Sequence, residues 1–486
     1  MSITGALANA NSGLAAASKR ADVVSNNVAN ALTEGYSRRE VSVAEQVLGD
    51  GSGAGVSVIG VTRADDPVVT REKRSAGAVM ERDQAIASAY STIDSALGDD
   101  SDAYSLFGQY QALETALQDL SDTPESVAAQ ASTLDSAKSL ATTLNRLSGD
   151  AQKARESAEQ KIAADVGTVN KSLKQIESLN KEIAKAAAGH RETASLEDQR
   201  KSLIDQVSSI IPVRELDAGA GQVDLITNEG VYLLSGTAKT IDFTQKGVIT
   251  ADLSYSGGTL SGLSVGGTDI TPGGSSNMAV RQGSLAGQFA VRDQVMPEYQ
   301  EKLDSLARDL MERFEGIDAT QTASDPGLFT DAGAAFDPLK EAGLASRIAV
   351  NTVVDPSSGG ALWRLRDGLG ATTQGPTSNA TFITTLLDSF TAARGLSSGA
   401  GLSGTYSATG AAAGISSLVG SARVSAQSSL ATSSARATAA SDAEKERTAV
   451  DSDQELQKLI LIEQAYAANA KVIKTAQSMI DVLMGL

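Results

Sequence analysis

The apolar positions at the two ends of the chain follow the same strict pattern. Near the N-terminus they recur at alternating steps of four and three residues: Ile3, Leu7, Ala10, Leu14, Ala17, Ala21, Val24 and Val28. Near the C-terminus the same alternation runs through Leu459, Ile462, Tyr466, Asn469, Ile473, Ala476, Ile480 and Leu483. This spacing places each set on one stripe of an α-helix, and such a stripe needs a partner helix. The pattern predicts two long helices, over 2–31 and 450–484, that pair with each other or with another subunit.

Between these ends the hydrophobic pattern alternates between helical and β periods. The predicted helical segments are 76–120, 124–188, 195–210, 284–316, 382–394 and 412–445. A third heptad stripe from Ile162 to Ala187 indicates a rod-like helix within 124–188. Alternating apolar residues between clustered glycines predict β-hairpins over 36–73 and a β module over 212–280. Glycine, proline and aspartate dominate 317–378, where we expect loops.

The fold class expected from these elements is mainly α with β modules. It comprises long paired N- and C-terminal coiled-coil helices, a helical rod-like middle domain with β-hairpins, and a small β module. The element order also requires the start of the chain to meet its end. We therefore expect three domains: 1–35 with 450–486 as a coiled-coil core, 36–211 with 283–449 as an elongated helical domain, and 212–282 as the β module.

Composition supports an extended helical protein. Only 4% of the 486 residues are aromatic and Trp363 is the one tryptophan, so a large central core is not expected. The net charge of −18 argues against nucleic acid or an anionic membrane as a partner. No stretch approaches the roughly 20 apolar residues of a membrane span. The first residues also lack the basic start and apolar run of a secretory signal.

The chain has few groups that could carry out catalysis. It contains no cysteine, and His190 is its only histidine, which removes most metal sites, catalytic triads and thiol dyads. Asp198, Gln199 and Arg200 are close in sequence, but adjacent residues on a helix do not face each other. For this trio, packing or a subunit contact is favoured over catalysis. We expect no enzyme activity, no cofactor and no metal.

Three asparagines near the end of the first predicted helix are unusual. Asn26, Asn27 and Asn30 lie within five residues, although asparagine is a mediocre helix former. One interpretation is a polar strip where helices pack closely and the amides find partners. The other is a fraying helix end that runs into a turn. Neither is decided by this segment alone.

This segment and a second one at the C-terminus resemble the rod, hook and hook-associated family of bacterial flagellar axial proteins. The residues that match the family pattern S-x-N-[IV]-A-N-x-x-T-x-G-[YF] are Ser25, Asn27, Val28, Ala29, Asn30, Thr33, Gly35 and Tyr36. At the other end, Gln464 to Ile473 is similar to the family block Q-x-x-[YF]-x-A-[NS]-[AS]-[KRQ]-[VT]-[IL]. Two blocks at opposite ends, each on its predicted helix, are more specific than either one alone.

Within the family, the chain is most similar to the members that form the junction between hook and filament. Arg38 follows Tyr36 and Ser37, where hook and rod proteins more often continue with lysine. Two internal stretches resemble junction-protein blocks: Leu196 to Arg200 with Leu203, and Gly283 to Gly287, which includes Leu285. Lys201 and Ala286 depart from the usual aspartate and glycine. The resemblance thins between about 317 and 440.

The resemblance implies a structural subunit of the flagellum that joins hook to filament by assembling through its terminal helices. The residues expected at the assembly interface are Ile3, Leu7, Leu14, Val24, Asn27, Val28, Asn30, Leu459, Ile462, Tyr466, Asn469, Ile473, Ile480 and Leu483. Because long isolated helices are marginal in water, these arms are expected to fold on assembly. Implied partners are copies of the chain, the hook protein, a second junction protein on the filament side and an export chaperone on the C-terminal helix. The implied location is extracellular, in the flagellum, after export without a cleaved signal.

Two alternatives remain open at this point. Within the family, the chain could be a hook or distal-rod subunit, which the two internal blocks argue against. From another class, it could be a secreted coiled-coil adhesin or effector with a catalytic β module. The shortage of histidine, cysteine and convergent acids argues against that alternative.

Overall fold

The computed structural model describes residues 3–33, 35–47, 53–99, 101–322 and 324–485. The chain divides into two compact units. Unit 1 comprises Met1–Val79, Gly167–Ile241 and Ser433–Leu486, and unit 2 comprises Met80–Val166 and Asp242–Thr432. Three helices have residues in both units: α2 (Pro67–Leu97), α4 (Val127–Ala188) and α11 (Ala408–Thr448).

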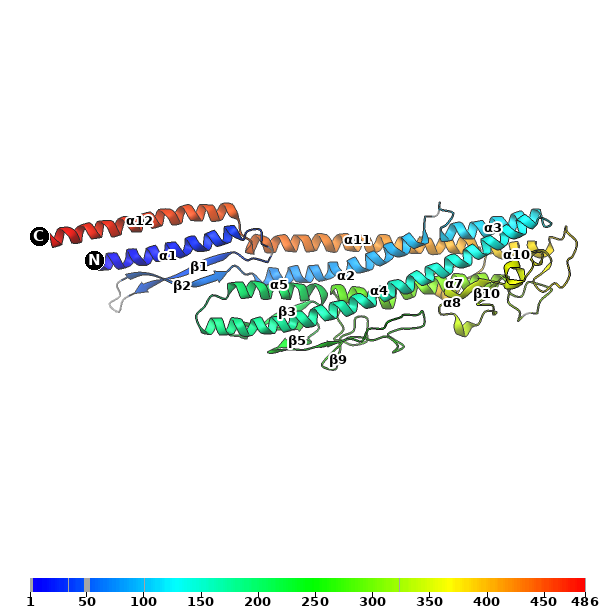
Figure 1. Cartoon of the computed structure of the whole chain (residues 1–486), viewed down its shortest axis with the longest axis horizontal. Helices are drawn as coiled ribbons and strands as arrows, with labels where there is room; N and C mark the ends of the chain where they lie inside the picture. Colours follow the sequence, from blue (N-terminus) through cyan, green and yellow to red (C-terminus); the bar gives the residue numbers. More distant parts are fainter. Residues whose placement is uncertain (1–2, 34, 48–52, 100, 323, 486) are drawn as a thin grey trace. The chain divides into compact units, whose positions relative to one another are not determined.

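The expected fold class is confirmed, because long helices dominate and the sheets are small and antiparallel. In unit 1 the terminal helices α1 (Ile3–Ala29) and α12 (Ser452–Met484) lie side by side and antiparallel, with both chain ends at the same end of the pair (Figure 1). The start of α12 is set by Asp451, whose carboxylate accepts the N–H groups of Asp453 and Gln454 at 3.0 and 3.1 Å. Such a cap satisfies N–H groups that have no partner within the helix.

A two-stranded hairpin follows α1 and packs on it. Strands β1 (Arg39–Val47) and β2 (Gly53–Arg63) pair antiparallel, and both contact α1. Gly55 has φ +93°, and a Cβ there would lie 2.1 Å from the hydroxyl of Ser12 on α1. Only glycine tolerates both the positive φ and this close approach. Two glycines of the expected hairpin turn, Gly49 and Gly51, fall outside the described residues.

Two predicted boundaries are wrong. The β region expected to run to residue 73 ends earlier, because Asp66 caps α2 through the N–H of Val68 at 3.2 Å and Pro67 occupies its first turn. The helix expected over 76–120 is two helices, α2 and α3 (Leu106–Asp122). Gly98, with φ +81°, ends the first, and the hydroxyl of Ser105 caps the second through the N–H of Gly108 at 3.0 Å.

The rest of unit 1 is a helix pair with a small sheet. Helix α5 (Ala194–Ile210) lies in the same unit as the C-terminal part of α4. The sheet has the order β3–β4–β5–β6, with strands Val213–Gly219, Gln222–Thr227, Tyr232–Ser235 and Thr237–Ala238. Asn180 of α4 binds β4 in two ways, donating to the carbonyl of Val223 at 2.7 Å and accepting its N–H at 3.3 Å. A second sheet has the order β7–β8–β9, with strands Ile241–Asp242, Ser264–Val265 and Thr268–Asp269, of which β8 and β9 belong to unit 2.

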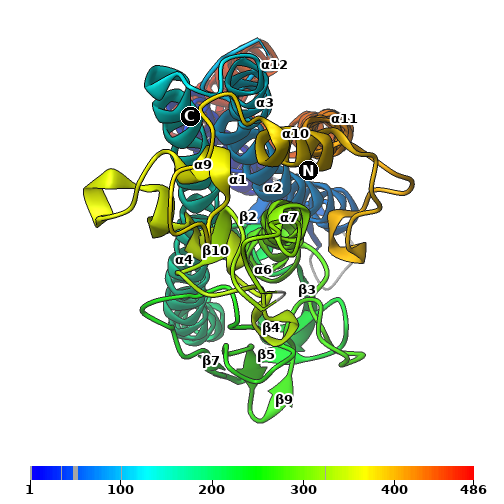
Figure 2. The same cartoon turned by 90° about the vertical axis from the view of Figure 1, so that its right-hand side faces the viewer.

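The core of unit 2 is built around α7 (Met296–Phe314). The predicted apolar face of Leu303, Leu306, Leu310 and Phe314 is buried as expected. Helix α6 (Gly283–Ala290) leads into α7 through a π-helical turn, Val291–Val295. Helix α10 (Thr381–Thr391) contacts α3, α7 and α9 (Arg364–Asp367), and Figure 2 shows it beside α9.

The segment expected to be loops, 317–378, contains only short elements. They are the strand pair β10 (Phe329–Asp331) and β11 (Ile348–Val350), helices α8 (Leu344–Arg347) and α9, and the 3-10 turns Pro338–Lys340, Thr352–Val354 and Pro356–Ser358. A further 3-10 turn, Ser398–Ala400, precedes α11. The residue bounds of the two compact units differ from those of the three expected domains. The three-domain division stays a prediction.

Candidate functional site

The side chain of Asn27 lies at the end of α1 and joins three elements of unit 1. Its amide nitrogen donates to the carbonyl of Arg39 at 2.9 Å and to the carboxylate of Glu455 at 2.8 Å. Its amide oxygen accepts the N–H of Arg39 at 3.0 Å and the hydroxyl of Tyr36 at 2.9 Å. All the hydrogen-bonding capacity of this fully buried amide is used. Asn27 therefore links the last turn of α1 to the first residue of β1 and the first turn of α12.

Glu455 completes this contact from the other end of the chain. It is 1% exposed, and its carboxylate also accepts Lys458 at 2.7 Å. A buried carboxylate is costly unless it is paired and hydrogen-bonded, and here both conditions are met. The loop that follows α1 makes a further connection, because the N–H of Arg38 donates to the carbonyl of Thr448 at 2.8 Å.

The other two asparagines belong to the helix end. Asn30 donates to the carbonyl of Asn26 at 2.9 Å and accepts the hydroxyl of Thr33 at 3.3 Å. Gly35 then takes φ +80°, a conformation that favours glycine. Asn27 fits the interpretation as a polar contact between closely packed elements. Asn30 fits the interpretation as a helix end that runs into a turn.

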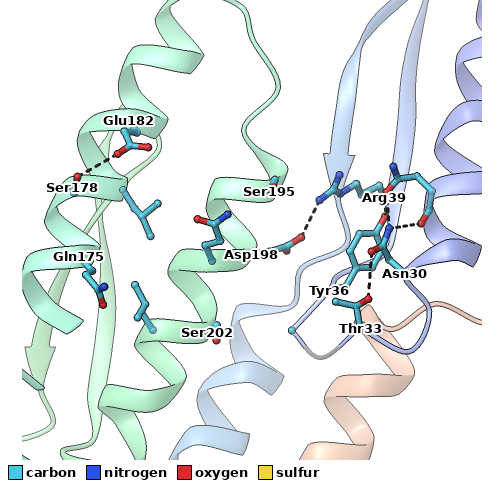
Figure 3. A pocket seen from close by; sticks show the side chains of 15 residues that line it. Asn30, Thr33, Tyr36, Arg39, Gln175, Ser178, Glu182, Ser195, Asp198 and Ser202 are labelled. Carbon is cyan, nitrogen blue, oxygen red and sulfur yellow. Dashed lines mark hydrogen bonds and ion pairs between the residues drawn. The ribbon is translucent and has the colours of Figure 1, made fainter. Parts of the chain in front are cut away.

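An open groove of about 840 Å³ lies beside this helix end, within unit 1 (Figure 3). One side is formed by Asn26, Asn30, Tyr36 and Arg39, and the facing side by residues of α4 and α5. The guanidinium of Arg39 lies 4.8 Å from the centre of the Tyr36 ring, which is a cation–π arrangement. Burial raises the pKa of Tyr36, and its phenol donates to the amide oxygen of Asn27.

The internal block on α5 contacts this region through Asp198. Its carboxylate pairs with Arg39 at 3.3 Å and with Arg63 of β2 at 3.4 Å. Arg200 points elsewhere and donates to Asn180 at 2.9 Å and to the carbonyl of Gly221 at 2.6 Å. Gln199 is exposed and lines the groove. Asp198 and Arg200 thus hold different elements, and their geometry is that of packing.

The apolar stripe of α1 is covered to different depths. Ala10, Ala17 and Val24 are buried, Ile3, Leu7 and Leu14 are half-buried, and Val28 is 38% exposed. On the predicted stripe of α12, Ile462, Asn469, Ile473 and Ile480 are half-buried and Ala476 is buried. Leu459, Tyr466 and Leu483 lie on the same predicted stripe but are exposed. The pairing of α1 with α12 therefore leaves part of the stripe uncovered.

A second stripe on α12 is exposed along its whole length. Its residues again alternate by four and three: Leu461, Ala465, Ala468, Val472, Thr475, Met479 and Val482. The exposed fractions of Leu461 and Val482 are 64% and 66%. Contiguous exposed apolar surface is typical of interaction sites. This second stripe was not predicted from the sequence, because the heptad spacing alone does not show which face of α12 meets α1.

The second internal block, Gly283 to Gly287, lies in unit 2. Gly283 begins α6 with φ +90°, and Leu285 is fully buried in the core. A Cβ at Gly287 would lie 2.8 Å from the Cβ of Ala85 and 2.9 Å from the carbonyl of Arg82, both on α2. The final glycine of the block therefore allows two helices to approach closely.

Sequence reasoning missed several residues of the Asn27 contact. Glu455, Arg39 and Arg63 were not singled out, because a charged residue near a helix end or on a strand is usually a solvated one. Within the described ranges, no group of three or more histidine, aspartate or glutamate residues is arranged to hold a metal. Over the same ranges, no helix is long and apolar enough to cross a membrane.

Three family models match separate stretches of the chain. The model described as "Flagellar hook-associated protein FlgK helical domain" matches residues 90–335. Models described as "Flagella basal body rod protein" and "Flagellar basal body rod FlgEFG protein C-terminal" match residues 7–36 and 446–486. The two end models cover α1 and α12, and the first model covers most of unit 2 together with part of unit 1.

Individual relatives carry the name "Flagellar hook-associated protein 1". The relative from Salmonella typhimurium is 31% identical over 241 residues, which are 47% of this chain and 42% of the relative. The relative from Escherichia coli is 27% identical, over 65% of this chain and 58% of the relative. The relative from Bacillus subtilis is 26% identical, over 73% of this chain and 75% of the relative. The chain thus spans about half the length of the first two.

A solved structure, the flagellar hook junction protein FlgK from Burkholderia pseudomallei, aligns with 54% of this chain and 47% of its own. The identity is 18% and the TM-score 0.44, a likeness too low to carry further argument. The family model is decisive, since its match to residues 90–335 covers half of the chain. The chain belongs to the flagellar hook-associated protein 1 family.

Proposed function

We propose that this chain is a structural subunit of the bacterial flagellum that joins the hook to the filament by assembling through α1 and α12. Family membership supports the flagellar role. The observation that supports assembly through these helices is the second stripe of α12. It keeps a heptad spacing along the helix, and α1 leaves it exposed. In a ring of subunits, this stripe would pack against a terminal helix of a neighbouring copy.

The proposed partners follow from this role. They are copies of the chain, the hook protein on one side and a second junction protein on the filament side. Before assembly, an export chaperone would cover the apolar face of α12 and keep the chain soluble. The proposed location is extracellular, in the flagellum. Deleting 450–486 should abolish chaperone binding, and binding that survives the deletion would rule out this part of the proposal.

A loss-of-function strain separates the proposal from its closest alternative. Without a junction subunit, cells should carry complete hooks and no filaments. Without a hook or distal-rod subunit, they should carry no complete hook, and this alternative has support because the two end models are named for rod proteins. Electron microscopy of isolated hook–basal bodies distinguishes the outcomes. Complete hooks with normal filaments would contradict both proposals.

The exposed stripe can be tested directly. Leu461→Glu with Val472→Glu places two charges on exposed positions of this stripe, away from the hollow that Met479 lines with Ile3 of α1. We expect these variants to be exported but to fail in filament attachment, since a buried unpaired charge destabilises an interface. Lys474→Gln changes charge on another exposed part of α12 and serves as the control. Normal filaments on the double variant would show that the stripe is not an assembly surface.

A further inference from the structure

Two polar side chains interrupt the face of α12 that meets α1, and both meet α1 at equivalent places. Glu455 accepts the amide of Asn27 at 2.8 Å and is 1% exposed. Asn469 lies two heptads after Glu455 on α12, and Gly13 lies two heptads before Asn27 on α1. These two residues also lie against each other. A Cβ at Gly13 would be 2.8 Å from the amide nitrogen of Asn469. The two contacts therefore report one antiparallel register.

Apolar residues alone would not define this register. Apart from Tyr466 of α12 and Arg20, which lies one heptad from both Gly13 and Asn27 on α1, the remaining contact face is made of alanine, leucine, isoleucine and valine, which accept one another after a shift of one heptad. The buried Asn27–Glu455 pair discriminates, because a donor or acceptor that loses its partner costs about 1–3 kcal/mol. Asn469 is half-buried and donates to the carbonyl of Ala465 in its own helix, so it discriminates by size, through the room that Gly13 leaves for it. Single polar positions in helical coiled coils are known to specify register in this way, at some cost in stability.

A one-heptad shift disrupts both contacts. In one direction, Asn27 comes opposite the apolar side chain of Ile462, and Asn469 comes opposite Arg20 instead of the glycine that leaves it room. Glu455 then extends past the end of α1 at Ala29. In the other direction, Asn27 moves beyond the start of α12 at Ser452. Each shift leaves at least one of these polar groups without its partner.

We propose that the Asn27–Glu455 and Gly13–Asn469 contacts, which we call the register contacts, fix the axial register of α1 against α12. The inference rests on the proposed function, in which these two helices are the assembling part. One heptad corresponds to about 10 Å along a helix. A shift of that size would displace the exposed stripe of α12 along α1 and out of step with neighbouring copies. The register contacts position the assembly surface and do not contribute to it.

The absence of cysteine makes the register measurable in the full-length chain. Ala6 and Ala476 lie one heptad beyond Gly13 and Asn469, so Ala6→Cys with Ala476→Cys reports the native register. Ala6→Cys with Leu483→Cys reports a shift by one heptad. Oxidation of the dilute monomer, followed by electrophoresis and peptide mapping, gives the yield of each intramolecular disulfide.

The test variant is Glu455→Leu with Asn469→Leu. Both changes lie on α12, so Asn27 keeps its bonds to Arg39 and Tyr36. We expect helical content by circular dichroism to be maintained, while the ratio of shifted to native disulfide rises about tenfold, equivalent to about 1.4 kcal/mol of register preference. Gln457→Leu with Gln477→Leu, at exposed positions of the same helix, should leave the ratio unchanged.

A conservative variant separates positioning from general stability. Glu455→Gln can still accept from Asn27 and should retain the native register, even if loss of the Lys458 pair lowers stability. The proposal is overturned if the double leucine variant forms only the native disulfide, or if the unmodified background fails to form it. The measurement uses the free chain, in which the structure pairs α1 with α12, so its result is independent of whether the chain joins hook to filament. A native disulfide in the free chain would also contradict the expectation that the two arms fold only on assembly.

Discussion

Asp304 of α7 accepts the backbone N–H of Ala345 at 2.8 Å and so caps the start of the short helix α8. The same carboxylate accepts the N–H of Gly343 at 2.8 Å and the side-chain amide of Gln300 at 2.9 Å. Gly343 reaches this position with φ +77°. The buried carboxylate of Asp304 on α7 thereby fixes the backbone at the start of α8, in a segment whose sequence shows little periodicity. Burial raises the pKa of Asp304 to about 6 despite these hydrogen bonds.

The raised pKa of Asp304 predicts a pH dependence of stability. In the unfolded chain an aspartate titrates near pH 3.9, so between about pH 4 and 6 the folded state holds a proton that the unfolded state has released. The contribution of Asp304 to the free energy of unfolding therefore falls as pH rises, by about 1 kcal/mol from pH 5 to 7. Denaturant titration followed by Trp363 fluorescence in unit 2 measures it. Asp304→Asn should remove this part of the dependence, and an unchanged dependence would contradict the assignment.

The opposite sign is expected for Asp205 of α5. Burial alone would raise its pKa, but Arg74, Lys201 and Lys73 together lower it to about 2. Its stabilising contribution is therefore complete above about pH 4 and is lost as pH falls toward 2. Asp205→Asn should destabilise unit 1 by about 3 kcal/mol at pH 7, because it leaves these cations without their shared partner.

Amide hydrogen exchange of α5 at pH 7 measures the Asp205 effect, since Trp363 lies in unit 2. Glu446→Gln, which removes an exposed carboxylate of α11, is the control and should leave exchange unchanged. The difference between wild type and Asp205→Asn should also disappear in acid unfolding as the pH approaches 2. A difference that persists there would show that the carboxylate acts through packing and not through its charge.

Arg313 of α7 should be essential to the core of unit 2. It is fully buried, pairs with Asp309 at 2.7 Å, and donates to the carbonyls of Ser389, Ala392 and Tyr406 at 2.7 to 2.9 Å. Arg313→Met removes the bonds to Asp309 and to the carbonyls of Ser389 and Ala392, and the carbonyl of Tyr406 keeps only the N–H of Arg394, so we expect a loss of about 3–5 kcal/mol in denaturant titration. Arg308→Met removes a partly exposed pair with Glu312 on the same helix and should cost less than about 1 kcal/mol. Equal losses would contradict this prediction.

Two glycines within helices of unit 2 should respond oppositely to alanine. At Gly287 the added methyl would overlap Ala85 and Arg82, so Gly287→Ala should destabilise unit 2 by about 1–3 kcal/mol. At Gly149 of α4 an added Cβ would have no atom within 4 Å of the kind that could clash with it. Gly149→Ala should therefore stabilise unit 2 by about 0.5–1 kcal/mol through helix propensity. Thermal unfolding followed by circular dichroism distinguishes them. A stabilising Gly287→Ala would show that α6 does not approach α2 as closely as the structure has it.

Elements with a strong local pattern were predicted well from the sequence. The bounds of α4, α5 and α12 agree within about three residues, because their periodicity and end signals are properties of consecutive residues. The break between α2 and α3 was missed. Gly98 ends α2 and Ser105 caps α3, but glycine and serine also occur inside the other predicted helices, so their presence alone did not indicate a break. The early start of α2 was also missed. It depends on Asp66, which caps the helix, and on Pro67 in its first turn.

The sequence by itself determined which segments are helices, which stripes of the terminal helices are apolar, and that the chain has no cysteine and one histidine. The tertiary structure decided which stripe of α12 meets α1, and which carboxylate meets Asn27. That carboxylate belongs to Glu455, 428 residues away along the chain. The physical reason is that periodicity reports what a helix can bury, and this is a local property. The partner of a buried polar group depends on how distant segments return to one another, which no local pattern contains.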